Sequence, residues 1–491
     1  MIFWSSVIII LLFFLIVIIS KHVTESRTPQ NFPPGPRPLP IIGNLHILSL
    51  KRPQKTFVEL SKKYGSVFSF QMGPRKTVVL TGYEAVKEAL VDHADVFAER
   101  PDIPIFKLFL KNMGILFSHG ENWKVMRRFT LTTLRDFGMG KRTLEDKIAE
   151  ECSFLLKSFE SQKGNPFMSK TIISTAVSNI IVSILLGHRF DYQDPLFLRL
   201  INLLSENVVL LGSPSVMVYN VYPALGFLLA GHRSIKKNTD EFRSFIAKTL
   251  IQHLRQLDAN DQRSLIDVFL VRQEAEKSNP SSYFHEDNLI SLASNLFAAG
   301  TETTTTTLYW GLLLMIKYPE VQRKVQEEIE TVMGSSQPKI EHRKKMPYTD
   351  AVIHEIQRYA NILPLSVHRE TTTEIKFKGY LIPKGTYIIP VLESVLYDKT
   401  QFEKPTEFNP QHFLNSEGLF IKKEAFMPFG AGRRICAGET LAKMELFLFF
   451  VSLLQRFTFR PPPDLTDFDF KTLTGITISP KPYKICALPR S

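Results

Sequence analysis

The stretch FGAGRRICAG, residues 429–438, says most about the fold of this chain, because glycines and arginines surround a single cysteine there. Gly432 and Gly438 permit positive φ angles and a close approach of the backbone to a neighbouring group. Arg434 and the N-terminus of the apolar helix that follows both favour a negative charge on the sulfur of Cys436. The pattern predicts an ionised thiolate held in a tight loop.

The composition is that of an ordinary globular protein, with 44% apolar and 22% charged residues. Three cysteines in 491 residues exclude a disulfide-rich secreted scaffold, and no C-x-x-C pair offers a zinc or redox site. Cys152 and Cys486 are therefore expected to be small core residues. The net charge of +12 favours acidic partners or an anionic membrane surface, whereas no block of Lys and Arg indicates nucleic-acid binding.

Residues 2–20 are apolar apart from three serines, Ser5, Ser6 and Ser20. As a helix this run is roughly 27 Å long at about 1.5 Å per residue, close to the ~30 Å hydrocarbon core of a bilayer. A cleaved signal peptide is the alternative, but such a peptide has a positive charge before its apolar run. We expect a transmembrane signal anchor at residues 2–20, with the protein body in the cytosol because the basic residues follow the span.

Residues 21–44 are predicted to be a Pro-rich linker, because the prolines within 33–40 can join neither a helix nor a central strand. Residues 45–491 contain no second linker and no repeat, so one large domain is expected there. The expected fold is mainly α with a small β-sheet. Helical periodicity is found at residues 53–64, 83–92, 121–135, 143–161, 169–186, 195–211, 234–256, 287–317, 320–333, 348–360 and 438–456, and strand patterns at 67–71, 77–80 and 374–389.

The loop at residues 429–438 resembles the haem-binding loop of the cytochrome P-450 superfamily, whose pattern is Phe-x-x-Gly-x-Arg-x-Cys-x-Gly, and every fixed position matches. The resemblance implies a cytochrome P-450 fold, haem b as the cofactor and Cys436 as the thiolate ligand of its iron. It covers nearly the whole chain. The likeness is greatest to vertebrate microsomal enzymes of the second P-450 family, through the stretches AGTETT (299–304), FGMGKR (137–142) and AKMELFLF (442–449).

Five consecutive threonines, Thr303 to Thr307, interrupt the predicted helix at 287–317, although β-branched residues are poor helix formers. Hydroxyls that bond back to the i−4 carbonyl are one explanation. The family resemblance implies another, in which this turn lies over the haem, Gly300 leaves room for dioxygen, and Glu302 and Thr303 deliver protons as the catalytic pair.

Three further residues are assigned a structural role by resemblance. Glu355 and Arg358 match the Glu-x-x-Arg pair of the family, although an i, i+3 ion pair alone is a weak signal. The usual third member is an arginine, and this chain has His412 in its place. Histidine cannot form the bidentate pair of an arginine, so a weaker interaction with Glu355 is expected.

Trp123 and Arg127 lie four residues apart on one face of a predicted helix. One alternative is that the two residues only form a cation–π pair at the surface. The resemblance implies that both bind a haem propionate, because arginine holds carboxylates in fixed geometry. The further members of this cofactor-binding set would be Arg369, Arg434 and Arg100.

The resemblance implies a monooxygenase that uses dioxygen and electrons from NADPH to hydroxylate or epoxidise lipophilic substrates such as xenobiotics, fatty acids and steroids. No G-x-G-x-x-G site follows a strand, so the electrons must come through a separate protein. A peroxide-rearranging isomerase and a non-catalytic haem sensor are the alternatives, and neither needs Glu302 with Thr303.

The substrate pocket is expected to be apolar. Its lining, by correspondence with the family's substrate-recognition regions, would be Leu116, Phe117, Phe297, Ala298, Ala299, Leu363, Val367 and Ile476. Lys111 offers a partner for a substrate carboxylate, with a solvated surface lysine as the alternative.

The electron donor implied by the resemblance is NADPH–cytochrome P-450 reductase, with cytochrome b5 as an auxiliary donor, both at the endoplasmic reticulum membrane. An acidic partner needs a basic face on this chain. The candidates flank the motifs expected on the cysteine side of the haem: Arg128, Arg135, Lys141, Arg142, Lys422, Lys423, Arg433 and Lys443. The alternative is that they are ordinary solvated residues.

Overall fold

The computed structural model describes residues 31–463 and 471–490. The predicted anchor at residues 2–20 and the first part of the predicted linker lie outside the described residues. Within the rest of that linker, residues 32–38 form neither helix nor strand, as the prolines require.

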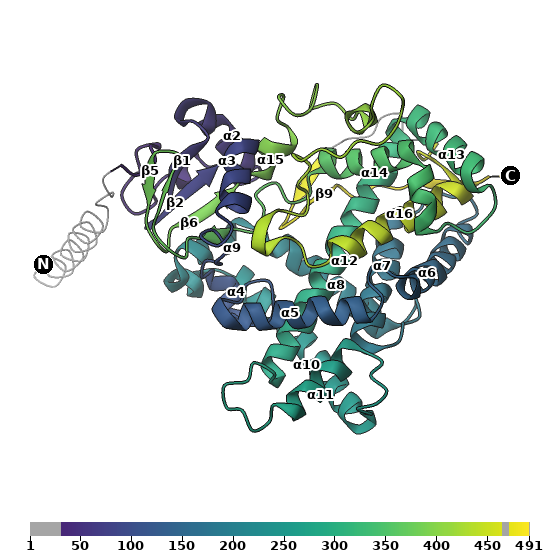
Figure 1. Cartoon of the computed structure of the whole chain (residues 1–491), viewed down its shortest axis with the longest axis horizontal. Coiled ribbons are helices and arrows are strands. Elements are labelled where there is room, and N and C mark those ends of the chain that lie inside the picture. The colour runs from purple at the N-terminus through teal and green to yellow at the C-terminus, as the bar shows by residue number, and fades with distance from the viewer. Residues whose placement is uncertain (1–30, 464–470, 491) are drawn as a thin grey trace, which may run out of the picture.

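Most of the described chain is helical (Figure 1). The α-helices are α2 (Pro53–Tyr64), α3 (Tyr83–Lys87), α4 (Pro104–Leu110), α5 (Gly120–Asp136), α6 (Arg142–Glu160), α7 (Ser169–Leu186), α8 (Pro195–Leu211), α9 (Pro214–Val221), α10 (Gly231–Gln256), α11 (Leu265–Ala275), α12 (Glu286–Lys317), α13 (Pro319–Met333), α14 (Pro347–Ala360), α15 (Leu392–Leu396) and α16 (Glu439–Arg456). The short helical turns are η1 (Leu45–Ile47), η2 (Glu88–Asp92), η3 (Pro223–Leu228), η4 (Ile340–Lys345), η5 (Pro410–Phe413) and η6 (Gly432–Arg434).

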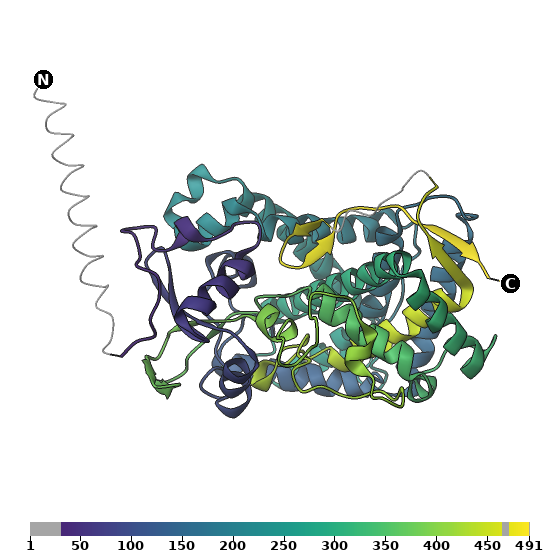
Figure 2. The same cartoon turned by 90° about the horizontal axis from the view of Figure 1, so that it is seen from above.

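The strands form one four-stranded sheet and three two-stranded ribbons. Their bounds are β1 (Val67–Met72), β2 (Arg75–Leu80), β3 (Arg369–Glu370), β4 (Ile375–Phe377), β5 (Tyr380–Ile382), β6 (Tyr387–Pro390), β7 (Phe457–Arg460), β8 (Thr472–Thr474), β9 (Ile478–Pro480) and β10 (Cys486–Pro489). The larger sheet has the order β1-β2-β6-β3, and β2 and β6 are its parallel pair. Figures 1 and 2 show this sheet at one end of the molecule and the helices at the other, which confirms the mainly α class with a small sheet.

The predicted long helices agree closely with the observed ones because their apolar periodicity is long and regular. Helices α4, α9, α11 and α15 were not predicted from the sequence, since helices of at most 11 residues have too few turns for a clear period. Strands β7 to β10 were not predicted either, because three or four residues each are too short for a visible alternation.

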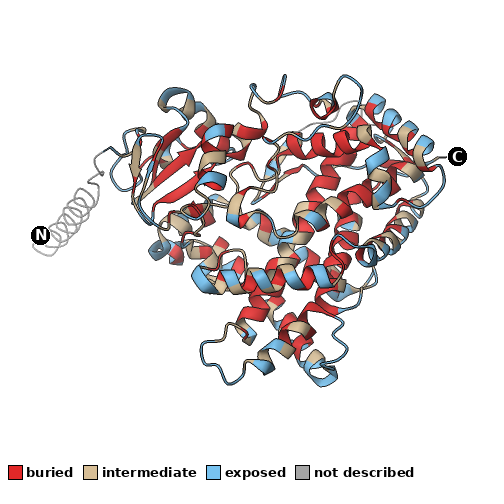
Figure 3. Ribbon diagram, viewed as in Figure 1, coloured by how far each residue is buried: buried red, intermediate tan, exposed pale blue. Residues whose placement is uncertain are grey.

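Helix α12 runs through the centre of the helical region and is buried along most of its length (Figure 3). It packs against α7, α14 and α16. A Cβ at Gly300 would lie 2.5 Å from the Cδ1 atom of Ile181 in α7, so this glycine is needed for the close approach of the two helices. This contact adds a packing role for Gly300, and the expectation that it leaves room for dioxygen stays a prediction.

Among the described residues, α7 is the one single helix long and apolar enough to cross a membrane. It is mostly buried, with 78% of its residues inside the protein, which is typical of a core helix.

Candidate active site

The cysteine loop connects η6 to α16 and depends on two glycines. Gly430 and Gly432 have φ angles of 72° and 71°, and a Cβ at Gly432 would lie 1.7 Å from the carbonyl oxygen of Leu90. The close backbone approach predicted for Gly432 is confirmed. Gly438 does not use a positive φ, since its φ is −94°, and no protein atom lies within 4 Å of its Cβ position.

Cys436 has solvent-accessible surface. The protein atoms packed around its thiol nevertheless raise its pKa. The Gly438 N–H and the charge of Arg127 lower the pKa, but burial outweighs them. The predicted thiolate is thus not favoured by the chain alone. The Arg434 guanidinium bonds the carbonyl oxygens of Ala98 and Ser118 and the Glu99 carboxylate, and Arg127 is the arginine whose charge lowers this pKa. A bound metal ion deprotonates a coordinating thiol outright.

Four arginines from distant parts of the sequence gather beside this loop. Arg100, Arg369 and Arg434 are buried and Arg127 is half-buried. Burial lowers the pKa of each buried arginine, and the charges of neighbouring arginines in the cluster lower it further. Burial lowers the pKa of Arg369 and of Arg434 to about 9. Such a concentration of buried positive charge requires anions nearby.

The carboxylate of Glu99 is the anion that the chain itself supplies to this cluster, 3.1 Å from Arg434 Nη2. Burial alone would raise the pKa of Glu99, but hydrogen bonds from His119 and the Arg100 N–H, with the charge of Arg434, lower it to about 2. The sequence analysis missed Glu99, although it directly precedes Arg100. One carboxylate does not balance four guanidinium groups.

Three hydrogen-bond donors in this region are buried and have no partner. They are Trp123 Nε1, Arg369 Nε and Arg434 Nη1. Arg434 also stacks on the Trp123 ring, with its Cζ atom 3.8 Å from the ring centroid. Buried donors normally have acceptors, so this donor set fits a ligand with carboxylate groups placed next to Cys436.

Arg100 differs from the other members of the predicted set. Its guanidinium donates to the carbonyl oxygens of Leu116, Val367 and His368 at 3.1, 2.6 and 2.7 Å. These bonds join two loops that the sequence analysis assigned to the substrate pocket. Arg100 therefore holds these two loops together. Arg127 instead donates to the Ile435 carbonyl at 2.7 Å, within the cysteine loop.

The predicted catalytic turn of α12 has one open side. Ala299 is exposed and Thr303 half-exposed, in the middle of a helix whose neighbouring residues are buried. The Thr303 hydroxyl donates to the Ala299 carbonyl at 2.7 Å. Glu302 is buried on another face, where its carboxylate accepts from Thr306 and Thr477 at 2.9 and 2.8 Å. The two predicted catalytic side chains therefore have separate partners.

The other predicted pocket residues have different surroundings. Leu116 and Val367 are joined through Arg100, and Asn295 Oδ1 of α12 accepts from the Leu116 N–H at 3.0 Å. Phe117 and Phe297 are buried against Phe106 and Phe242. Ala298 and Leu363 are half-buried, and Ile476 is exposed on the β8–β9 turn, where its N–H donates to Val208. Lys111 is exposed and bonds Asp287 at 3.1 Å, as the surface alternative predicts.

Glu355, Arg358 and His412 meet in a fully buried network. Arg358 donates to both Glu355 oxygens at 2.7 Å, and its remaining donors bond three backbone carbonyls, those of Leu396, Pro405 and Glu407. His412 Nδ1 lies 3.1 Å from Glu355 and its Nε2 faces the Glu403 carbonyl. Both ring nitrogens thus face acceptors, and the predicted contact between His412 and Glu355 is present.

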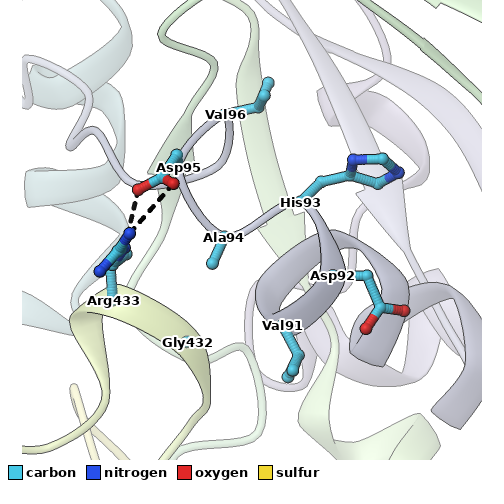
Figure 4. A pocket seen from close by; sticks show the side chains of 8 residues that line it. All are labelled: Val91, Asp92, His93, Ala94, Asp95, Val96, Gly432 and Arg433. Carbon is cyan, nitrogen blue, oxygen red and sulfur yellow. Dashed lines mark hydrogen bonds and ion pairs between the residues drawn. The ribbon is translucent and has the colours of Figure 1, made fainter.

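The predicted basic residues fall into two groups. Arg433 and Lys443 form ion pairs with Asp95 and Glu439, and Lys423 donates to the Gln401 carbonyl. In the described part of the chain, no ion pair is formed by Arg128, Arg135, Lys141, Arg142 or Lys422. The Arg433–Asp95 pair borders a surface hollow of about 630 Å³ beside Gly432 (Figure 4). Both partners are exposed, so the pair contributes little to stability.

A mainly helical fold with a buried arginine cluster beside a glycine-framed cysteine fits the haem-thiolate class of proteins, whose cofactor carries two propionates and an iron. The sequence model of the family described as Cytochrome P450 matches residues 33–487, and the chain belongs to that family.

The relatives belong to its second family of vertebrate enzymes. Cytochrome P450 2K1 of Oncorhynchus mykiss is 50% identical over 463 residues, which are 93% of this chain and 92% of that protein. Cytochrome P450 2K6 of Danio rerio is 50% identical over 92% of this chain and 90% of its own length. Cytochrome P450 2C23 of Rattus norvegicus is 47% identical over 95% of each.

The chain is thus a haem-thiolate monooxygenase that contains haem b and oxidises lipophilic substrates. It needs a redox partner for its electrons.

Proposed function

We propose that Cys436 ligates the haem iron and that Trp123, Arg127, Arg369 and Arg434 hold the haem propionates. The observation that carries this assignment is the set of three buried donors without partners beside the cysteine loop. Arg100 contributes positive charge and, through its three carbonyl contacts, positions the loops at Leu116 and Val367. When bound, haem supplies the iron centre at which dioxygen is reduced and split.

The protein groups have distinct tasks in this proposal. The apolar residues beside Ala299 orient the substrate and exclude water. Thr303, on the open side of α12, passes a proton through its hydroxyl. Glu302 lies in the same turn and serves as the acid that resupplies this proton, once its hydrogen bonds to Thr306 and Thr477 exchange. Glu355, Arg358 and His412 act structurally, because all three are buried and bonded within the protein.

Thr303→Ala is expected to keep the haem spectrum while lowering product formation on the order of 10²-fold, the lower end of the range for a positioned proton donor. NADPH electrons should then appear as hydrogen peroxide. The measurement is the ratio of product to peroxide per NADPH, in enzyme reconstituted with reductase and screened against arachidonate, steroids and alkoxyresorufins.

Thr307→Ala is the matched control for Thr303→Ala. Thr307 makes the same i−4 hydrogen bond, to the Thr303 carbonyl at 2.9 Å, one turn further along the same helix face, but its side chain is buried. It should change coupling little, and Thr303→Ser should restore it. Unchanged product and peroxide yields in Thr303→Ala would contradict the proton-delivery role.

We further propose that the electrons arrive from NADPH–cytochrome P-450 reductase, with cytochrome b5 as a second donor. The support is the group of unpaired basic residues on α5 and at the start of α6, which suits an acidic flavoprotein. Arg128 and Arg135 of α5 are exposed and project from the helix that also carries Trp123 and Arg127.

Reversing the charge of Arg128 and Arg135 to Glu together is expected to slow reductase-supported turnover severalfold and to flatten its salt dependence. Charge complementarity acts on the encounter rate and is screened over a Debye length of about 8 Å at physiological salt. Peroxide-supported turnover bypasses the partner and should be unchanged. Equal loss by both routes would mean damage to the haem site rather than to a docking face.

The matched control reverses Lys376 and Lys384, which are exposed on the β4–β5 hairpin and on the turn that follows it. This variant has the same net charge as the α5 variant. It should retain reductase-supported turnover, and a similar loss would mean that overall charge, not this face, governs the encounter.

We also propose that the enzyme is held at the endoplasmic reticulum membrane by the anchor at residues 2–20, followed by a linker at 21–44 and the cytosolic monooxygenase domain at 45–491. Exposed apolar residues near the start of the described chain support this proposal. The Tyr222 hydroxyl donates to the Ile41 carbonyl, which brings residues 39–42 beside the segment after α9. In that segment Phe227 and Leu228 are 73% and 68% exposed, as expected of a surface that rests on lipid.

A further inference from the structure

Two asparagines on one face of α12 hydrogen-bond the loop that joins α4 to α5, residues 111–119. Asn288 Oδ1 accepts from the Gly114 N–H at 2.8 Å. Two helical turns later, Asn295 Oδ1 accepts from the N–H groups of the next two loop residues at 3.0 Å each. Asn288 is 0% and Asn295 4% exposed, so bulk water does not compete for these bonds. Side chains of α12 therefore hold the loop in place.

Gly114 is the residue at which the loop lies closest to α12. Its φ is 76°, and a Cβ there would lie 2.5 Å from Asn295 Oδ1, so a larger residue would be strained and would collide. The Gly114 N–H donates to Asn288, and its carbonyl oxygen accepts from Ser118 Oγ at 2.5 Å. Both backbone polar groups of Gly114 thus bond to side chains, which fixes the start of the loop.

The side-chain amide of Asn288 joins this loop to two further segments. Its Nδ2 atom donates to Asn122 Oδ1 of α5 and to the Tyr283 carbonyl, which precedes α12, at 2.8 Å each. Both N–H donors and the oxygen of the amide therefore have partners. Asn122 directly precedes Trp123, one of the residues proposed to hold the haem propionates. The amide of Asn288 connects α12, α5 and the loop at one buried point.

The loop carries two of the residues assigned to the substrate pocket, Leu116 and Phe117. We propose that Asn288 is a positioning residue, which holds the start of this loop against α12 and α5 and thereby places Leu116 and Phe117 for contact with a lipophilic substrate. The inference rests on the proposed function through the assignment of these two residues to the pocket. The hydrogen bonds that hold the loop do not depend on that assignment.

A buried asparagine with a purely structural role would stabilise the fold and leave the pocket unaffected. Asn179 of α7 provides this comparison, because it is 1% exposed and also makes three hydrogen bonds. Its Oδ1 atom accepts from the Phe190 N–H at 2.9 Å, and its Nδ2 donates to the Phe190 carbonyl and to Glu151 at 3.0 and 3.2 Å. The loop that it holds contains no residue assigned to the pocket, so Asn179→Leu is the matched control for Asn288→Leu.

Hydrogen exchange in the holoenzyme is the first test of Asn288→Leu. The peptide that contains residues 112–118 should exchange severalfold faster than in the unaltered protein, because the Gly114 N–H loses its acceptor. Asn179→Leu should leave this peptide unchanged and should speed exchange in the peptide around Phe190. Unchanged exchange at 112–118 in Asn288→Leu would overturn the claim that Asn288 holds the loop.

Imidazole and phenylimidazole test whether the held loop shapes the pocket. Both ligate haem iron through a ring nitrogen, and only phenylimidazole adds an apolar ring, so the ratio of their dissociation constants reports contact with the pocket walls. Asn288→Leu should weaken phenylimidazole severalfold and leave imidazole nearly unchanged, as measured by the shift of the Soret band. Asn179→Leu should keep the original ratio, although both variants lower the denaturation midpoint. An equal change of the ratio in both variants would overturn the positioning role.

Gly114→Ala tests the same contact from the loop side. It leaves the side chains of α12 and α5 intact, and it replaces Asn288→Leu if that variant does not yield holoenzyme. It should speed exchange at 112–118 and weaken phenylimidazole in the same direction. The double variant should be no worse than the worse single one, because both substitutions release the same loop. Additive effects of the two substitutions would contradict the proposal.

The failure of the proposed function would look different from the failure of this inference. Faster exchange at 112–118 with an unchanged ratio of dissociation constants would overturn the assignment of Leu116 and Phe117 to the pocket, while Asn288 would still hold the loop. Unchanged exchange would overturn the role of Asn288 and leave the pocket assignment intact.

Discussion

Cys436→Ser is expected to abolish monooxygenase turnover and to remove the thiolate-type Soret band of the reduced, carbon monoxide-bound protein. A serine hydroxyl stays protonated where a metal-bound thiol does not, and it donates far less electron density to iron. The fold around the loop should survive, because the arrangement of the loop depends on Gly430 and Gly432 and on the Cys436 N–H bond to the Phe429 carbonyl. Haem content, measured after denaturation, should therefore fall less than activity.

Cys152→Ser and Cys486→Ser are the controls for this substitution. Both cysteines are buried, whereas Cys436 is exposed, so neither presents its sulfur to a ligand as Cys436 does. Each control should retain the thiolate-type band. A thiolate-type band that persists in Cys436→Ser, or vanishes in Cys486→Ser, would contradict the assignment of the ligand.

Arg358→Leu is expected to cost about 3–5 kcal/mol of folding free energy, because it leaves the carboxylate of Glu355 buried without its main partner. The side chains of both residues are 0% exposed. Three carbonyl oxygens, of Leu396, Pro405 and Glu407, also lose their donors. The expected result is holoenzyme of low yield with a greatly lowered denaturation midpoint.

Lys62→Leu is the control, because Lys62 and Glu59 have the same i, i+3 spacing as Arg358 and Glu355. Lys62 and Glu59 form an i, i+3 pair at 2.7 Å, but their side chains are 67% and 68% exposed, so the loss should be below about 1 kcal/mol. Arg358→Lys should still be strongly destabilising, because one ammonium group cannot replace five donors in a planar fork. If Arg358→Leu and Lys62→Leu proved equally mild, the structural role of the buried network would be refuted.

Much of the helical framework could be predicted because it depends on local patterns. The boundary at Tyr318-Pro319 is one example, since proline both ends α12 and begins α13. Helices α7 and α8 have the predicted bounds, because their apolar periods are long and their ends lie at Gly187 and Gly212. Short elements such as α15 carry no comparable local signal.

The active site was predicted in part for the same reason. Cys436 and Thr303 lie in motifs whose spacing is local, and the sequence identifies them. Glu302 lies in the same motif, but its partner Thr477 comes from a turn 175 residues later. Its separation from Thr303 on the helix surface could not be read from the motif.

The sequence by itself determined the family, the cofactor class and the candidate ligand, because a glycine-framed cysteine loop is a contiguous pattern with its own backbone requirements. Only the tertiary structure decided which arginine influences the sulfur, what His412 contacts and which loop Asn288 holds. These properties depend on residues brought together from distant segments, and on the desolvation that packing imposes. A charge buried by such packing changes its pKa and its partners, and neither quantity is written in local spacing.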